Sequence, residues 1–276
     1  MTAEIAILNK SAVALAADSA VTVQHGKGFK IFQTNKLFHL CRSNPVAIMV
    51  YQNAELMSVP WETIIKRYRK ELGDTTFDTL EEYGTNFVAH LNNNAVLFPE
   101  SVQDSAAHRD IAVPLRGLSA LIDETIKAAA SKKPISERQI KTIAGRAINK
   151  LHGVLKALPV PPDLSPSIEK EILQRHGAFI DQMIANFDPL PLSKQLKNRL
   201  REIALWFLSK DLSETGWEHY SGLVVAGFGA ADLYPSVMTF RVDSVVLNQL
   251  KYGHLKDKSE RITASRLAKS YCLRPR

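Results

Sequence analysis

Residues 12–19 of the chain read AVALAADS, a short continuous apolar run that ends in an acid and a serine. An apolar run of this length is typical of a strand that is buried on both faces. Similar short β segments, separated by turns, fill the sequence from residue 3 to residue 51. These turns are too short for helical crossovers, so the first fifty residues predict antiparallel strands.

A helical block separates this region from a second β region. Apolar residues recur at helical spacing in several segments between residues 61 and 211, whereas residues 92–116 are mixed and predict a loop-rich stretch. Strand patterns return at 221–228 and 233–246. The predicted class is therefore α+β. The predicted parts are residues 1–72, the first half of a β-rich core; 73–215, a helical insertion; 216–250, the last strands of the core; and 251–276, a basic tail.

Composition narrows the classes of function. Of the 276 residues, 45% are hydrophobic and 23% are charged, which is ordinary for folded proteins and excludes wholesale disorder. No apolar run approaches the ~18 residues that a membrane span needs, and the N-terminus lacks the basic cluster of a secretory signal. Two cysteines cannot form a disulfide framework, and eight histidines show no paired metal spacing. We expect a cytoplasmic protein without membrane association, metal or other cofactor.

The net charge of +7 lies mostly at one end of the chain. Residues 251–276 hold eight basic and two acidic residues, whereas residues 121–220 hold fifteen and twelve. A basic terminal segment can bind nucleic acid. No zinc-finger spacing, aromatic RNA-binding motif or helix-turn-helix pattern accompanies it. A solvated chain end is therefore favoured over a nucleic-acid-binding arm, and nucleic acid is not an expected partner.

Thr2 is the candidate nucleophile. Initiator methionine is normally removed when a residue as small as threonine follows it, so the mature chain is expected to begin at Thr2. A hydroxyl and a free α-amino group then belong to one residue. An α-amino group has an ordinary pKa of about 7.7–8.0, so a large neutral fraction can accept the proton of the hydroxyl. A nearby cation lowers this pKa further, and an acid can hold the cation in place.

The residues after Thr2 resemble the N-terminal threonine peptidases, the family of proteasome β-subunits and HslV-type peptidases within the Ntn-hydrolase superfamily. In that family an aspartate stands sixteen residues after the threonine, at the end of an Ala-Ala-Asp-Ser strand, as Asp18 does here. The family's lysine lies sixteen residues further on. Lys36 lies eighteen residues after Asp18, and Lys30 is the alternative candidate for this lysine. Ser221, followed by a glycine and an apolar strand, resembles the serine that supports the N-terminal amine.

The resemblance implies an αββα sandwich of antiparallel sheets with a helical insertion, and it implies a role for each residue. Thr2 would attack a peptide carbonyl, and Lys36 would stabilise charge and lower the pKa of the amine. Asp18 would orient Lys36, and Ser221 would support the amine. In the family a glycine-rich turn offers a backbone N–H to the oxyanion, and Tyr51 stands at that position here, followed by another non-glycine residue.

The resemblance covers roughly residues 1–70 and 216–246. It implies a peptide or unfolded protein as substrate, assembly with further copies of the chain, and service by an ATP-driven unfoldase. The family's remaining aspartate and serine have no clear match, and Asp257 and Ser259 are candidates by composition alone. The alternative function is that of an inactive scaffold subunit, because larger side chains replace the glycines of the oxyanion turn.

Overall fold

The computed structural model describes residues 4–25, 28–92, 94–131, 133–187, 190, 192–215, 220–255, 260–261 and 268–272. For residues 20–25, 28–33, 214, 260–261 and 268–272 the description is limited to the backbone. Thr2, Asp257 and Ser259 lie outside the described residues.

The chain divides into two compact units that interleave in sequence. Unit 1 comprises Met1–Phe98, Glu218–Val245 and Tyr252–Arg276, and unit 2 comprises Pro99–Trp217 and Val246–Lys251. These boundaries differ from the predicted ones at two places. The helical segment that follows residue 72 belongs to unit 1 as far as Phe98, and residues 251–276 contribute strands to unit 1 instead of forming only a tail.

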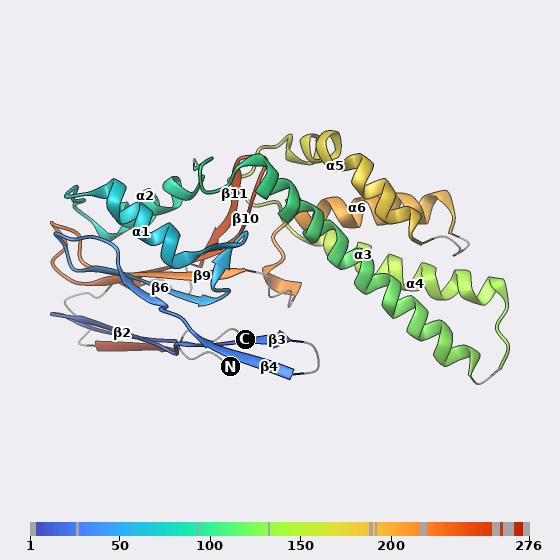
Figure 1. The fold of residues 1–276 in the computed structure, drawn as a ribbon, viewed down its shortest axis with the longest axis horizontal. Helices are drawn as coiled ribbons and strands as arrows, with labels where there is room; N and C mark the ends of the chain where they lie inside the picture. The colour runs from blue at the N-terminus through green and yellow to red at the C-terminus, as the bar shows by residue number, and fades with distance from the viewer. Residues whose placement is uncertain are drawn as a thin grey trace. The chain divides into compact units, whose positions relative to one another are not determined.

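Unit 1 contains nearly all of the strands and the first two helices (Figure 1). The strand pairs described are antiparallel throughout, which confirms the α+β class with antiparallel sheets. The strands are β1 (Glu4–Asn9), β2 (Val13–Ala17), β3 (Ala20–His25), β4 (Gly28–Gln33), β5 (Leu37–His39), β6 (Val46–Gln52), β7 (Glu55–Leu56), β8 (Val59–Pro60), β9 (Ser221–Gly227), β10 (Ser236–Val246), β11 (Gln249–His254), β12 (Glu260–Arg261) and β13 (Ala268–Cys272).

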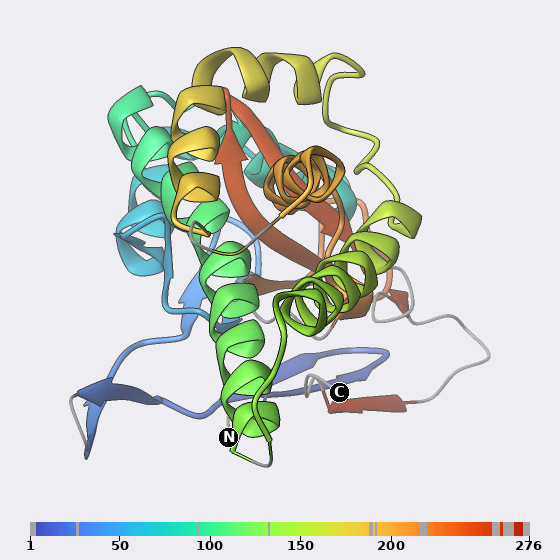
Figure 2. The same ribbon diagram turned by 90° about the vertical axis from the view of Figure 1, so that its right-hand side faces the viewer.

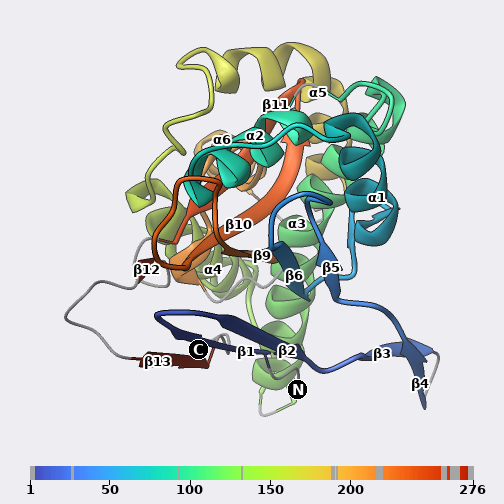
Figure 3. The ribbon, with the colours of Figure 1, turned by 90° about the vertical axis from the view of Figure 1, so that its left-hand side faces the viewer.

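Two sheets and a pair of helices make three layers in unit 1 (Figure 3). The larger sheet has the order β11-β10-β9-β6-β5, and the smaller one has the order β13-β1-β2. Side chains from both sheets meet in one apolar core between them; its buried members are Ala6, Leu8, Met49, Tyr51, Val224, Ala226 and Val237. Helices α1 (Trp61–Leu72) and α2 (Leu80–Asn92) lie on the other face of the larger sheet. Strand β9 is therefore buried along its whole length, as expected for a strand covered on both faces.

Helix α1 follows directly from its sequence. Pro60 precedes the first turn, where its missing N–H costs nothing, and Gly73 ends the helix with a φ of 59°, a conformation that glycine adopts without strain. The residues buried on its inner face recur at helical spacing; they are Trp61, Ile64, Ile65, Tyr68 and Leu72.

Helix α2 is capped by an aspartate that is distant in sequence. The Asp232 carboxylate accepts a hydrogen bond from the backbone N–H of Leu80, at 2.8 Å, and another from Gly229, at 2.9 Å. A Cβ at Gly229 would lie only 2.2 Å from the carbonyl oxygen of Asp78, so this close approach of two backbones requires glycine. The first turn of α2 is thus joined to the β9–β10 connection.

Unit 2 is a bundle of four helices (Figure 1, Figure 2). They are α3 (Glu100–Ala130), α4 (Glu137–Ala157), α5 (Ile168–Ala185) and α6 (Lys194–Ser209). Ser136 and Gln139 form a capping box at the start of α4, and the Ser193 side chain caps α6. Helix α3 continues through Pro114 and replaces the loop expected at 92–116 from residue 100 onward. The described helices include none long and apolar enough to cross a membrane.

We expect replacement of Asp232 by alanine to lower the free energy of unfolding by about 1–2 kcal/mol, because two backbone donors lose their acceptor. Asp232→Asn, which keeps one acceptor oxygen, should lose less. Urea unfolding followed by circular dichroism measures both variants. Equal unfolding midpoints for wild type and Asp232→Ala would contradict the proposed capping role.

Candidate functional site

A cavity in unit 1 gathers several of the predicted site residues. It encloses about 360 Å³ of space that is open to solvent. The segment before β5, the end of β6 and the first turn of α1 form its wall. Its lining residues are Thr34, Asn35, Lys36, Val50, Tyr51, Gln52, Asn53, Ala54, Pro60, Trp61 and Glu62. Lys36 and Tyr51 are thus at one cavity, whereas Asp18 and Ser221 are not among its lining residues.

Antiparallel pairing brings the start of β5 and the end of β6 to this cavity. The backbone N–H of Val50 donates to the carbonyl oxygen of Lys36 at 2.8 Å, and β5 continues the pairing with β6. On the other side, Gln52 of β6 pairs with Ser221 of β9. Gln52 has a φ of 69°, in the left-handed region that non-glycine residues rarely occupy. The strand therefore ends in a conformation that favours glycine, although glutamine occupies the position.

Tyr51 belongs both to the cavity lining and to the core. It is one of the residues that line the cavity, and its side chain is 1% exposed in the core between the sheets. There the ring lies over Gly222 of the neighbouring strand, and a Cβ at Gly222 would come within 1.9–2.3 Å of the ring atoms. Tyr51 also meets Tyr220 edge-on, with ring centroids 6.5 Å apart. Only glycine at 222 leaves room for this aromatic ring.

Ser221 bonds to the connection between β6 and α1. Its hydroxyl oxygen accepts a hydrogen bond from the indole N–H of Trp61 at 2.8 Å. The hydroxyl in turn donates to the carbonyl of Glu55 at 3.4 Å or that of Asn53 at 3.5 Å. Ser221 is buried, so these bonds offset its loss of water. In this structure the hydroxyl holds the β6–α1 connection in place.

Lys36 and Asp18 are both described, and Thr2 is not. The side chain of Lys36 is 6% exposed, which is unusual for lysine because burial of an ammonium group is costly without compensating partners. Asp18 is half-buried just after β2.

Glu4 is a buried residue that the sequence did not single out. It alternates with Ala6 and Leu8 on the inner face of β1, and its side chain is fully buried. Ile5 and Ile7, on the outer face, are 42% and 49% exposed. A sequence pattern that places the more apolar side chains in the core predicts that Ile5 and Ile7 point inward and that Glu4 points outward, which is the opposite of the structure. The inward acid of β1 therefore adds an ionisable group to the core between the sheets.

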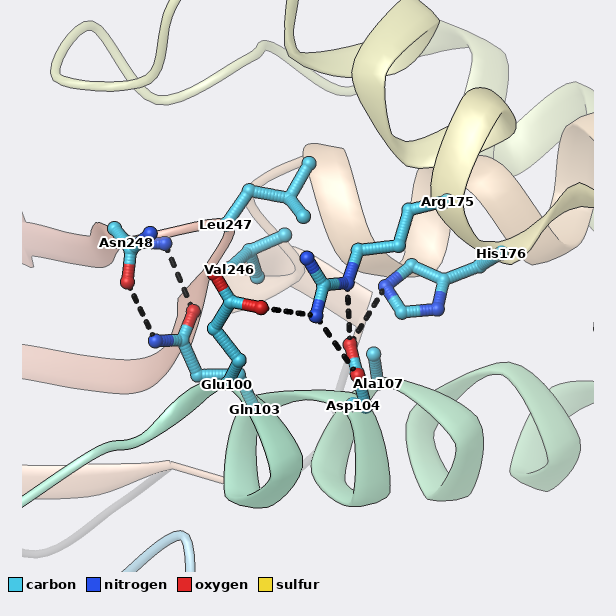
Figure 4. Close-up of a pocket in the computed structure, with 9 residues that line it drawn as sticks. All are labelled: Glu100, Gln103, Asp104, Ala107, Arg175, His176, Val246, Leu247 and Asn248. Carbon is cyan, nitrogen blue, oxygen red and sulfur yellow. Dashed lines mark hydrogen bonds and ion pairs between the residues drawn. The ribbon is translucent and has the colours of Figure 1, made fainter. Parts of the chain in front are cut away.

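Unit 2 has a separate cavity, which is lined by charged residues of α3 and α5 (Figure 4). The Arg175 guanidinium bonds both carboxylate oxygens of Asp104, at 2.7 and 2.9 Å, and donates to Glu100 at 2.9 Å. The ring of the buried His176 lies 3.8 Å from the same Asp104 carboxylate. His108 of α3 packs edge-on against His176, with ring centroids 5.4 Å apart. This arrangement ties α3 to α5.

The pKa values in this cluster follow from pairing and burial. Hydrogen bonding to Arg175 lowers the pKa of Asp104 below its ordinary value. Burial lowers the pKa of His176, and the neighbouring charges of His108 and Arg175 also lower it, while Asp104 opposes the shift. The cluster reads as a structural ion pair because its charges satisfy one another.

The described histidine, cysteine and acidic side chains form no group of three that could hold a metal ion. No family model, no curated protein and no solved structure matches the chain. The cavity in unit 1, with its buried lysine, is therefore the candidate functional site.

We expect Gly222→Ala to destabilise the protein by at least about 2 kcal/mol, because the new methyl group overlaps the Tyr51 ring. Tyr51→Ala should cost about 3–5 kcal/mol through loss of a buried aromatic ring. The double variant should lose less than the sum of the two, by about 1–2 kcal/mol, because the overlap is gone. Gly145→Ala in α4, where the nearest atom lies 3.7 Å away, is the control. Additive losses measured by urea unfolding would exclude the overlap.

The free energy of unfolding should fall as the pH is lowered from 7.5 to 5.5, and His176 should contribute to this fall. Its folded pKa lies below the ordinary 6.5, so the unfolded chain binds the proton first. His176→Gln should therefore flatten the pH dependence of the free energy of unfolding. Asp104 adds a loss of stability only below about pH 4. The same slope for wild type and His176→Gln would refute this assignment.

Proposed function

We propose that the chain is an N-terminal-threonine peptidase of the proteasome-like type, with an Ntn-hydrolase αββα sandwich as its fold. The cavity in unit 1 is the observation that carries the proposal. It combines the buried Lys36, the left-handed strand end at Gln52 and the first turn of α1. A cation at the cavity would suit a site where negative charge develops in a transition state. The two packed antiparallel sheets of unit 1, with helices α1 and α2 on the larger one, correspond to three of the four layers of such a sandwich.

In the proposed reaction Met1 is removed and Thr2 becomes the first residue. Its hydroxyl adds to the carbonyl carbon of a peptide bond, and its proton passes to the α-amino group, directly or through a water molecule. The C–N bond then breaks as the leaving amine takes this proton, which leaves an ester on Thr2. Water hydrolyses the ester and restores the hydroxyl. The charge on the carbonyl oxygen is stabilised by the backbone N–H of Tyr51.

The other residues position these groups in the proposal. Lys36 lowers the pKa of the amine through its positive charge, and Asp18 orients Lys36. Ser221 acts on the amine indirectly, by holding the connection that carries the cavity wall. The substrate class is an unfolded protein or peptide in the cytoplasm. The chain would act as a homo-oligomer, served by an ATP-driven unfoldase.

An inactive scaffold subunit is the second candidate. The observation that favours it is the engagement of the Ser221 hydroxyl with Trp61 and with backbone carbonyls. A serine used in this way has little capacity left for an amine. This candidate keeps the fold and the assembly but predicts no turnover.

Thr2→Ala should lower the hydrolysis of fluorogenic peptides by roughly 10³-fold or more, because the nucleophile is lost. Thr2→Ser, which keeps a hydroxyl, should retain measurable turnover. Lys36→Met should lower kcat by roughly 10²-fold, and the matched variant Lys30→Met should leave it within about twofold. The reverse order of the two lysine variants would assign the role to Lys30.

Mass spectrometry of the purified chain gives an independent check. The proposal requires a mature mass without Met1. A retained Met1 would exclude Thr2 as an N-terminal nucleophile. No turnover by wild type on any peptide, together with a free Thr2, would favour the scaffold subunit.

A further inference from the structure

Helix α4 and its neighbour α6 concentrate the positive charge of the helical bundle. Helix α4 holds five basic residues and one acidic residue, and α6 holds four and one. In contrast, α3 holds three basic and five acidic residues, and α5 holds two and three. The excess on α4 and α6 is visible only once the four helices are counted separately.

The basic side chains of α4 share its solvent face. The core side of the helix is fixed by Ala144, Ile148 and Leu155, which are buried in the apolar core of unit 2. With about 100° per residue, the basic positions fall within roughly half of the circumference: Arg146 and Lys150 lie opposite this core, Arg138 and Lys156 lie at its flank, and Lys141 lies near its edge. From the first to the last they extend over about 27 Å. These exposed residues are Arg138, Lys141, Arg146, Lys150 and Lys156.

Acidic partners offset little of this charge. Lys141 pairs with Glu137 one turn earlier, at 2.8 Å. Glu202 of the adjacent α6 already bonds a histidine of α4 at 2.6 Å. Arg199 of α6 adds a further cation where the two helices meet, because it bonds the neutral side chain of Asn149. Within the described residues, the other four basic side chains of α4 form no ion pair.

The chemistry of this face distinguishes between classes of partner. A stable protein interface needs an apolar centre, and the exposed large apolar side chain among these charges is Val154. A helix that binds a lipid surface inserts its apolar face, but the apolar face of α4 is used in the core. A polyphosphate chain needs only a row of cations that displaces its counterions. The face of α4 fits the last case.

We propose that the solvent face of α4, with Arg199 beside it, binds the sugar–phosphate backbone of nucleic acid. The interaction reads no bases, because lysine and arginine side chains on one exposed stripe contact phosphates without defined base partners. This surface belongs to unit 2 and does not depend on the peptidase proposed for unit 1.

The test measures fluorescence anisotropy of a labelled mixed-sequence DNA of about 20 nucleotides, single-stranded and duplex, across a salt series. Wild type is compared with the triple variant Arg138→Gln/Arg146→Gln/Lys150→Gln. The matched control Arg42→Gln/Lys70→Gln/Lys170→Gln removes the same charge at exposed positions outside α4 and the helices α3 and α6 that pack on it. The triple variant should bind at least about tenfold more weakly, with a salt slope smaller by about 2–3, because three phosphate contacts are lost. The control should bind within about twofold of wild type.

Several results would overturn the proposal. One is that the wild type does not bind DNA at low salt. Another is that both triple variants bind equally weakly. A third is that the α4 variant binds as well as the wild type, which would place the site elsewhere, for example in 251–276. Binding of polyglutamate or anionic vesicles through α4, without binding of DNA, would also overturn it. Unchanged far-ultraviolet circular dichroism and urea midpoints of the variants ensure that a loss of binding is not a loss of folding.

Discussion

The pairing of β6 with β9 is the contact on which both faces of unit 1 depend. This ladder runs from Val46 opposite Gly227 to Gln52 opposite Ser221, and it joins segments on either side of the helical block. One face of the pair packs against the smaller sheet, where the Tyr51 ring fills the space over Gly222. The last residues of the same ladder form the wall of the cavity. A shift in register would therefore disturb the core and the candidate site together.

The elements that could be predicted are those whose ends and buried face are marked by residues in the element itself or next to it. Helix α1 is marked by a preceding proline, a regular apolar spacing and a glycine at its end. Helix α3 was not predicted over its first half, because Pro114 and a mixed sequence oppose it. Its buried Ile111 and Leu115 stabilise it through packing against the rest of unit 2. The strands after residue 249 were not predicted, because their charged sequence lacks a clear alternation of apolar and polar residues.

The candidate site was predictable only in part. Lys36 and Tyr51 lie at one cavity because each is next to the end of a strand and those strands pair, which a sequence pattern can suggest. The bond between Trp61 and Ser221 joins residues 160 positions apart, and no local pattern indicates it. The burial of Glu4 could not be predicted either. Strand β1 has apolar residues on both of its faces, so its sequence does not indicate which face points to the core.

The pairing of β1 with β13 has a consequence for synthesis of the chain. Ile5 pairs with Cys272, so β1 meets this neighbour only after the whole stretch of chain between the two strands has been synthesised. At about 5–20 residues per second, β1 waits roughly 12–50 s with one edge unpaired. Contacts so distant in sequence also slow folding after release. During this interval the unpaired backbone groups along one edge of β1 are open to pairing with other chains, and the pairing with β13 removes this edge.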